Sequence, residues 1–322
     1  MEIARKGSVR FKSCAIRKVE DIGERDVWDI EVEEDHSYLS SGFVNHNSSS
    51  RPNLQNIPKT AEFRKLFKAK PGYVLVDSDF AALELRILAL VTGDEVMLKI
   101  FKDGVDPHSA TAARMFNLPI EAVTKDSKER KIGKAINFGI AYGEGAKKLG
   151  DSLGVTKDEA QKYLDDWGRT YPTITAWIRE TKRVLKETGK VRYSLGRERP
   201  LMGIFSNDSG LQAEAERQSV NTKIQGTGAD CTSLSIARIG ERLRQTFGED
   251  NARIVVEIHD AIVSEVREDL AHKTKEIVIA EMTRQMPWLS DAIPLAVDCE
   301  IKHTLGDGLP DGPPKCQKSC CR

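Results

Sequence analysis

The chain has 322 residues, of which 39% are hydrophobic and 30% charged, so it can bury a sizeable core and exceeds one average domain. No apolar run approaches the roughly 18 residues of a membrane span, and the first residues lack the apolar core of a signal peptide. We therefore expect a soluble, cytoplasmic protein of two or three units, with no membrane partner.

Charge is balanced over the whole chain but not along it. Lysine and arginine total 49, as do aspartate and glutamate, and a net charge of zero argues weakly against nucleic-acid binding. Residues 125–148, however, carry 7 basic and 3 acidic side chains. A local basic stripe matters more for phosphate binding than the sum over the chain, so nucleic acid stays a candidate partner.

The first 47 residues alternate short apolar runs and predict a small all-β segment. They end in Asn45-His46-Asn47, followed at once by Ser48. The side-chain amide of Asn47 can attack its own main-chain carbonyl and break the following bond, with His46 moving the protons. Ser48 offers a hydroxyl nucleophile for an ester. The triplet His46-Asn47-Ser48 alone is also typical of a polar loop.

Together with the strand pattern, this segment resembles the C-terminal end of an intein. The resemblance assigns Asp29 and His36 to acyl transfer and cyclisation. A complete intein is several times longer and begins with a Cys or Ser nucleophile, whereas this chain begins with Met1. We therefore expect residues 1–47 to be the C-terminal part of a split, Hint-type intein, which must associate with a partner chain before splicing.

Beyond residue 48 the pattern changes to an α+β body. Residues 73–76 predict a buried strand, which leads through Asp79 into an apolar helix. Helical patterns continue to about residue 185, and Arg253 to Val266 predicts a hairpin with Asp260 at its turn. An Asp before a helix is often only an N-cap. Two carboxylates at strand ends, however, suit hard cations.

A stripe of four side chains follows the segment from residue 130 to 142. Arg130, Lys134, Phe138 and Tyr142 are spaced by four, so on a helix they share one gently drifting face. Such a face offers cations to a triphosphate and aromatic rings to a base. A lone stripe of this kind is more often a solvated charged face, and Gly143 suits the end of the helix.

These motifs, in this order after Ser49 to Pro58, resemble family A (DNA polymerase I type) DNA polymerases. The resemblance covers residues 48–305 as palm and fingers, with the fingers at about 97–200, and implies template-directed addition of dNTPs to primer-template DNA. It places two Mg²⁺ ions on Asp79, Phe80 and Asp260, where two-metal catalysis activates the primer 3′-hydroxyl and stabilises the pyrophosphate.

The same resemblance assigns the nucleotide and DNA contacts. It implies that Lys134, Arg130 and His108 hold the incoming phosphates, that Phe138 flanks the sugar, and that Tyr142 guards the template side. Glu84 corresponds to the steric gate that excludes a 2′-hydroxyl. Four residues are expected to contact the primer-template, at groups similar for every base pair: Arg217, Asn221, Gln225 and His259.

The chain departs from the family pattern in two places. Ala261 stands where the family usually has Glu after the second aspartate, which leaves a catalytically weak primer-template binding module as the alternative. A third reading, a splicing element with a passive flank, is disfavoured by the intact Asp79, Lys134 and Asp260. The thumb and a Thr-Gly-Arg segment are also missing, so we expect the partner chain to supply both along with the N-terminal intein half.

The cysteines and the end of the chain carry little chemistry. Cys14, Cys231 and Cys299 are scattered and are best interpreted as reduced thiols. Residues 306–322 contain Pro310, Pro313 and Pro314 and predict a disordered tail. That tail also holds Cys316, Cys320 and Cys321, but a zinc site there lacks a convincing fourth ligand.

Overall fold

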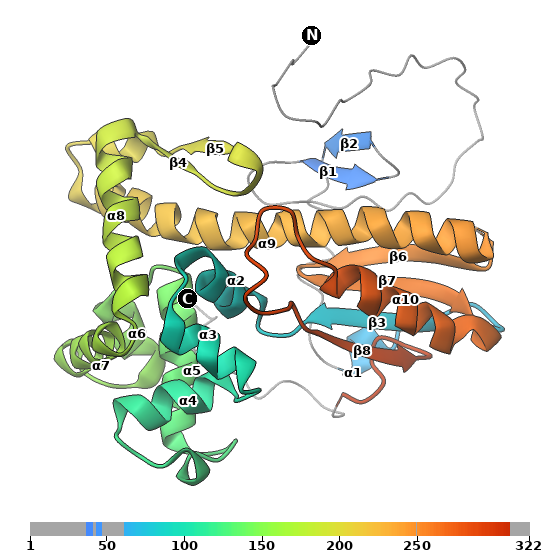
Figure 1. The fold of residues 1–322 in the computed structure, drawn as a ribbon, viewed down its shortest axis with the longest axis horizontal. Helices are drawn as coiled ribbons and strands as arrows, with labels where there is room; N and C mark the ends of the chain where they lie inside the picture. The colour runs from blue at the N-terminus through green and yellow to red at the C-terminus, as the bar shows by residue number, and fades with distance from the viewer. Residues whose placement is uncertain (1–36, 41–42, 47–60, 249, 310–322) are drawn as a thin grey trace.

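The computed structural model describes residues 37–40, 43–46, 61–248 and 250–309. A four-stranded antiparallel sheet and a helical body form most of this part, and one long helix runs across both (Figure 1). The α+β fold class expected from the sequence is therefore confirmed. No helix within the described residues is long and apolar enough to cross a bilayer.

The elements have the following bounds. The strands are β1 Ser37–Ser40, β2 Phe43–His46, β3 Tyr73–Phe80, β4 Lys190–Arg192, β5 Glu198–Pro200, β6 Ala252–Ile258, β7 Ala261–Arg267 and β8 Val297–Lys302. The α-helices are α1 Ala61–Arg64, α2 Leu83–Thr92, α3 Glu95–Lys102, α4 Pro107–Met115, α5 Lys128–Ala141, α6 Ala146–Leu153, α7 Lys157–Thr170, α8 Pro172–Thr188, α9 Ser209–Phe247 and α10 Ala271–Thr283. Short 3-10 turns are η2 Ile120–Ala122, η3 Ser194–Gly196, η4 Met202–Phe205 and η5 Glu268–Leu270.

The main sheet has the strand order β6-β7-β3-β8, with every neighbouring pair antiparallel. Alternate residues of β3 point to opposite faces, as a strand requires. Val74, Val76 and Phe80 belong to the main hydrophobic core, whereas Leu75 belongs to a smaller cluster with Val263. Helix α10 packs against β3 and β8, and α9 lies along β6, so helices cover one face of the sheet.

Helices α2 to α8 form the second body, whose core holds large fully buried side chains such as Trp167, Tyr171 and Ile136. Helix α9 links the two bodies, since it contacts α2 and α8 on one side and β6 and α10 on the other. Its 39 residues correspond to about 58 Å at 1.5 Å per residue. The helix therefore packs against both the sheet and the helical body.

The two ends of the described part of the chain are ordered, whereas the predicted domain boundaries stay predictions. Strands β1 and β2 pair antiparallel as a small hairpin beside α9, while residues 1–36 lie outside the described part of the chain. At the other end, Asp307 accepts hydrogen bonds from the main-chain N–H groups of His303 and Thr304, and Leu305 is buried. Residues 306–309, which the sequence predicted as the start of a disordered tail, thus belong to the described fold, and residues 310–322, including the three tail cysteines, lie outside it.

Both cysteines in the described part of the chain are free thiols. Cys231 and Cys299 are buried, and the hydroxyl of Ser78 lies 3.0 Å from the sulfur of Cys299. Burial raises the pKa of Cys231 to about 12, which keeps this thiol protonated at neutral pH. We therefore interpret Cys231 and Cys299 as packing residues of the main hydrophobic core.

Candidate functional site

Asp79 and Asp260 come together at one end of the sheet. Asp79 is the penultimate residue of β3, and its Cα pairs with that of Ala261 on β7. Asp260 is in the two-residue turn between β6 and β7, because Ile258 pairs with Ala261. The side chains of the two aspartates are joined by a hydrogen bond. The N-cap alternative for Asp79 is wrong, since α2 begins only at Leu83 after Ala82.

The electrostatics of this pair favour a proton or a cation between the carboxyl groups. Burial raises the pKa of Asp79 to about 7, and the charge and hydrogen bond of Asp260 act in the same direction. Asp77 and Asp298 add smaller effects of the same sign. Asp298 pairs with Asp79 from the other neighbouring strand, β8. A cation bound beside these carboxylates would therefore be stabilised at this end of the sheet.

The turn that carries Asp260 is strained. His259 has φ of 60°, in the left-handed region that non-glycine residues seldom adopt, and its side chain is exposed. A two-residue hairpin with positive φ at its first central residue matches the twist of the strands. Strained positions of this kind cluster at functional sites, and here the strain aims Asp260 at Asp79.

The chain leaves β3 through a second left-handed residue, Ala82, with φ of 52°. Arg86 fixes this connection, because its Nε donates to the carbonyl of Ala81 at 3.0 Å and its Nη1 to that of Pro294 at 2.8 Å. The Arg86 guanidinium also lies over the ring of Phe101, 4.5 Å from the centroid. Arg86 thus ties the C-terminal end of β3 to the first turn of α2.

A hydrogen bond between Glu84 and Tyr142 links helix α2, which follows β3, to the end of helix α5. The Tyr142 hydroxyl donates to Oε1 of Glu84 at 3.0 Å and is also hydrogen-bonded to the side chain of Gln225 on α9. Burial raises the pKa of Glu84, the hydrogen bond from Tyr142 opposes this, and the charge of Asp79 adds to it. Burial also raises the pKa of Tyr142, with Glu84 and Asp260 adding to the effect.

The predicted stripe lies on α5, with one difference at its end. The helix stops at Ala141, so Tyr142 is its C-cap, and the left-handed Gly143, with φ of 66°, follows. The rings of Phe138 and Tyr142 stack at 6.3 Å with an interplanar angle of 17°. The Lys134 ammonium is 5.8 Å from the Phe138 centroid. The cations and rings therefore follow one face, as the spacing predicted.

Arg130 and His108 meet at the first turns of α4 and α5. Arg130 makes two hydrogen bonds to the carboxylate of Asp106, at 2.9 and 3.2 Å, which hold the pKa of that carboxyl at about 2 despite burial. Burial lowers the pKa of His108 to about 4, with Arg130 and Lys134 acting the same way and Asp106 opposing. The His108 ring lies 5.4 Å from that of Phe138. Asp106 was not predicted from the sequence.

Helix α9 presents the predicted DNA-contacting residues beside this group. Arg217 and Gln225 are exposed, and Asn221 is half-buried, with its Oδ1 atom lacking a hydrogen-bond partner among the described residues. A Cβ added at Gly143 would lie 3.0 Å from the carbonyl oxygen of Arg217, so the end of α5 packs closely on α9. Gln225 is hydrogen-bonded to Tyr142, which in turn is hydrogen-bonded to Glu84 near Asp79. These α9 residues are thereby connected to the aspartate pair.

The residues predicted to splice lie mostly outside the described part of the chain. His46 is the last residue of β2, whereas Asp29, His36, Asn47 and Ser48 fall in segments that the structure does not describe. Their roles stay predictions.

Two other residues near the site were not found from the sequence. Asp298 adjoins Asp79 only through strand pairing across 219 residues, and Asn137 is fully buried between His108 and Trp167. No local pattern distinguishes Asp298. A polar residue in an otherwise apolar helical position was the one available signal for Asn137.

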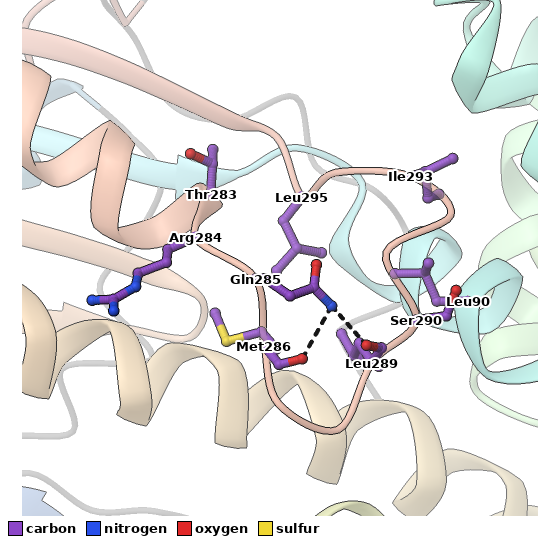
Figure 2. A pocket seen from close by; sticks show the side chains of 9 residues that line it. All are labelled: Leu90, Thr283, Arg284, Gln285, Met286, Leu289, Ser290, Ile293 and Leu295. Atoms are coloured by element: carbon purple, nitrogen blue, oxygen red, sulfur yellow. Dashed lines mark hydrogen bonds between the residues drawn. The ribbon is translucent and has the colours of Figure 1, made fainter.

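A small cavity lies away from these residues, between α2 and the loop that follows α10 (Figure 2). Leu90, Met286, Leu289 and Leu295 provide most of its apolar lining. The Gln285 amide donates to the carbonyl oxygens of Met286 and Leu289 at 3.2 and 2.7 Å and so closes the loop. We interpret this cavity as a packing defect under a loop rather than a ligand site.

Comparisons with known proteins agree on one family. The sequence model described as DNA polymerase family A matches residues 42–307. DNA polymerase I of Pseudomonas aeruginosa is 38% identical over 263 residues, covering 80% of this chain and 28% of that protein. The thermostable DNA polymerase I of Thermus aquaticus is 34% identical, covering 81% and 30%, and the DNA polymerase of Bacillus phage SP01 is 35% identical with the same coverage.

A solved structure is similar as well. It is the POL domain of Pol1 from M. smegmatis in complex with DNA primer-template and dNTP, at 28% identity and a TM-score of 0.74, covering 81% of this chain and 46% of that one. The chain spans less than a third of the length of the curated relatives named above. With the family model matching most of its length and the sheet, helices and motif order in agreement, the chain belongs to DNA polymerase family A.

Proposed function

We propose that this chain is the C-terminal part of a template-directed DNA polymerase, which joins a dNTP to a primer 3′-hydroxyl and releases pyrophosphate. The observation that carries this proposal is the hydrogen-bonded pair of Asp79 and Asp260, which lie near the ends of neighbouring strands of the sheet. The similar M. smegmatis domain was solved with primer-template and dNTP, which supports the same substrates here.

The donor set fits Mg²⁺. Among the described residues no group of three or more His, Cys, Asp and Glu side chains is arranged to hold a metal, so the candidate site is a carboxylate pair. Two neighbouring carboxylates, one of which raises the pKa of the other, suit a hard cation. The Phe80 main-chain carbonyl would add a third oxygen. Bound there, two Mg²⁺ ions would lower the pKa of the primer hydroxyl and stabilise the leaving pyrophosphate.

The chain's own residues position the nucleotide. Lys134 and Arg130 present cations along α5, and the pair with Asp106 fixes the Arg130 guanidinium before any ligand arrives. Phe138 supplies an aromatic face to the sugar. Glu84, held by Tyr142 at 3.0 Å, stands beside the aspartates, where its bulk would exclude a 2′-hydroxyl.

Residues of α9 and the strained turn face the duplex in this proposal. Arg217, Asn221 and Gln225 lie in one row on α9, and His259 precedes Asp260 in the turn. Donors placed in this way would contact phosphates and minor-groove acceptors that hardly vary between base pairs. An enzyme that copies any sequence needs that tolerance.

Primer extension tests the assignment of the carboxylates. The test uses the ligated enzyme, which is this chain joined at Ser48 to the upstream polymerase part of its partner. In it, Asp79→Asn and Asp260→Asn should each lower Mg²⁺-dependent extension by about 10³-fold or more, because metal stabilisation of the transition state is worth several kcal/mol. Primer-template binding should persist. Asp77→Asn is the control, since Asp77 is on the same strand but is paired with Lys302 at 2.8 Å. Extension at near the wild-type rate by Asp79→Asn would overturn the assignment.

Ala261 supports the second candidate, a primer-template binding module with weak chemistry. Its Cα pairs directly with that of Asp79, so a glutamate there would add a carboxylate beside the pair. Retained primer-template binding with no extension by the reconstituted wild-type protein would favour this candidate.

We also propose that residues 1–47 join the chain to an upstream partner by protein trans-splicing. The support is the Asn45-His46-Asn47-Ser48 junction directly before the polymerase region. Mixing the chain with a partner that carries the N-terminal intein half should give a product whose second part starts at Ser48, visible by mass spectrometry. Asn47→Ala should block release of the intein fragment, whereas the matched Asn45→Ala should not. Wild-type ligation by Asn47→Ala would exclude the splice junction.

A further inference from the structure

The buried amide of Asn137 lies among groups whose donor and acceptor roles are known. Trp167 Nε1 lies 2.9 Å from Asn137 Oδ1, and an indole N–H can only donate. On the other side of the amide, Nδ2 lies 3.4 Å from the carbonyl oxygen of Pro107, which can only accept. Both neighbours fix the same orientation of the amide, with the oxygen toward Trp167 and the nitrogen toward α4.

That orientation determines the proton on His108. Asn137 Nδ2 lies 3.2 Å from His108 Nδ1. Because Nδ2 is a donor, Nδ1 must accept, and a neutral imidazole then carries its proton on Nε2. The reverse arrangement would place the Asn137 NH₂ against the Trp167 N–H, two donors facing each other at 2.9 Å in a fully buried site.

The remaining contacts agree with this assignment. The Thr111 hydroxyl lies 2.8 Å from the carbonyl oxygen of Pro107 and 3.2 Å from Asn137 Oδ1, and both of these oxygens can accept its hydrogen bond. Its oxygen then accepts from Asn137 Nδ2 at 3.1 Å and from the Tyr171 hydroxyl at 2.8 Å. The two hydrogens of Asn137 Nδ2 are thus used by its two nearest acceptors, the Thr111 oxygen at 3.1 Å and His108 Nδ1 at 3.2 Å, and the Pro107 carbonyl at 3.4 Å is a weaker third neighbour. Asn137, Trp167 and Tyr171 are each almost completely buried, so water does not compete for these bonds.

We propose that Asn137 is a positioning residue, which holds His108 in the neutral tautomer with its proton on Nε2, and that Trp167 fixes the Asn137 amide for this task. The low pKa of His108, about 4, agrees with an imidazole that stays neutral at physiological pH. Among the described residues Nε2 has no hydrogen-bond partner, so its N–H stays available to a ligand. If the proposed function holds, that ligand is the anionic triphosphate of the dNTP.

The tautomer can be read in the 322-residue chain without any catalytic assay. In the ¹⁵N-histidine NMR spectrum at pH 7, an unprotonated ring nitrogen resonates far downfield of a protonated one, and His108→Gln identifies the His108 signals. We expect His108 Nδ1 to be unprotonated and Nε2 protonated. A protonated Nδ1 in the wild-type chain would overturn the proposal.

Asn137→Asp tests the cause. A carboxylate can only accept, so Nδ1 should become protonated in this variant. The same substitution at Asn251, whose amide donates to the carbonyl of Phe247 and not to a histidine, should leave the His108 signals unchanged. Unchanged signals in Asn137→Asp would show that another group sets the tautomer and would overturn the role of Asn137.

The consequence for nucleotide binding is measured separately in the ligated enzyme. At pH 9, where the imidazole is neutral, Asn137→Asp should raise KM for dNTP about tenfold, because Nε2 turns from donor to acceptor. In a His108→Gln background, which has no tautomer to set, the same substitution should change KM by less than about twofold. Equal KM effects in both backgrounds would overturn the link to the nucleotide, while the NMR result would still decide the tautomer.

Discussion

The close packing of α4 on α5 gives a prediction that the structure quantifies. Gly133 lies in the middle of α5, and a Cβ added there would be 2.7 Å from the carbonyl oxygen of His108. It would also approach the Cβ and N atoms of Ala112 to 3.1 and 3.2 Å. The first of these contacts joins a Cβ, whose position the backbone of α5 fixes, to a main-chain oxygen of α4, so no side chain can rotate to relieve it.

Gly133→Ala combines two opposing free energies. Replacing glycine by alanine inside a helix favours folding by about 1 kcal/mol. Overpacking of this kind costs about 1–3 kcal/mol. We expect a net loss of about 1–2 kcal/mol in the free energy of unfolding, because the backbone contact places the cost in the upper part of its range. In the ligated enzyme the displaced His108 should also weaken dNTP binding.

Gly240→Ala is the matched control. Gly240 lies inside α9, where an added Cβ meets nothing within 4 Å, so this variant should gain about 0.5–1 kcal/mol. Urea unfolding of both variants, followed by circular dichroism and linear extrapolation, measures the two changes. Equal stabilisation by both substitutions would refute the close approach of α4 and α5 at Gly133.

Three further outcomes follow from single side chains. Phe138→Tyr should ease incorporation of dideoxynucleotides, because in the family a tyrosine hydroxyl at this site substitutes for the missing 3′-hydroxyl interaction; an unchanged termination ratio on a primer-extension gel would reject this. Ala261→Glu should be tolerated, with extension at or above the wild-type rate, and its loss would show that the sheet edge cannot hold a further carboxylate. Burial raises the pKa of Glu257 from 4.5 to about 7, so the folded state binds more protons than the unfolded state between these values, and stability should fall as pH rises through this range. Glu257→Gln should remove that fall, and identical pH profiles of the unfolding free energy would contradict the burial of this carboxyl.

Local sequence determined the elements that carry the site. Near neighbours along the chain set three features that are observed: the apolar run of β3, the turn at Asp260, and the side chains spaced four residues apart on α5. The end of α5 was also readable, because Gly143 adopts the left-handed conformation that a helix stop favours. The family resemblance rested on the order of these same local motifs.

The long helix α9 shows where local patterns fail. Its 39 residues were not predicted as one helix, although the spacing of Arg217, Asn221 and Gln225 indicated part of it. Helices α2, α8 and α10 and strand β6 contact α9 on different sides. Its buried residues therefore surround the helix instead of forming one apolar stripe, and periodicity gives a weak signal.

Only the tertiary structure decided which groups surround the reactive side chains. Asp298 reaches Asp79 through the pairing of β8 with β3, and Asp106 holds Arg130 because α4 and α5 begin side by side. Asn137 faces His108 and Trp167 across three helices. Hydrogen bonds and charge effects act through a few ångströms of space, whereas the sequence specifies neighbours along the chain, so contacts between distant segments appear only when the fold brings them together.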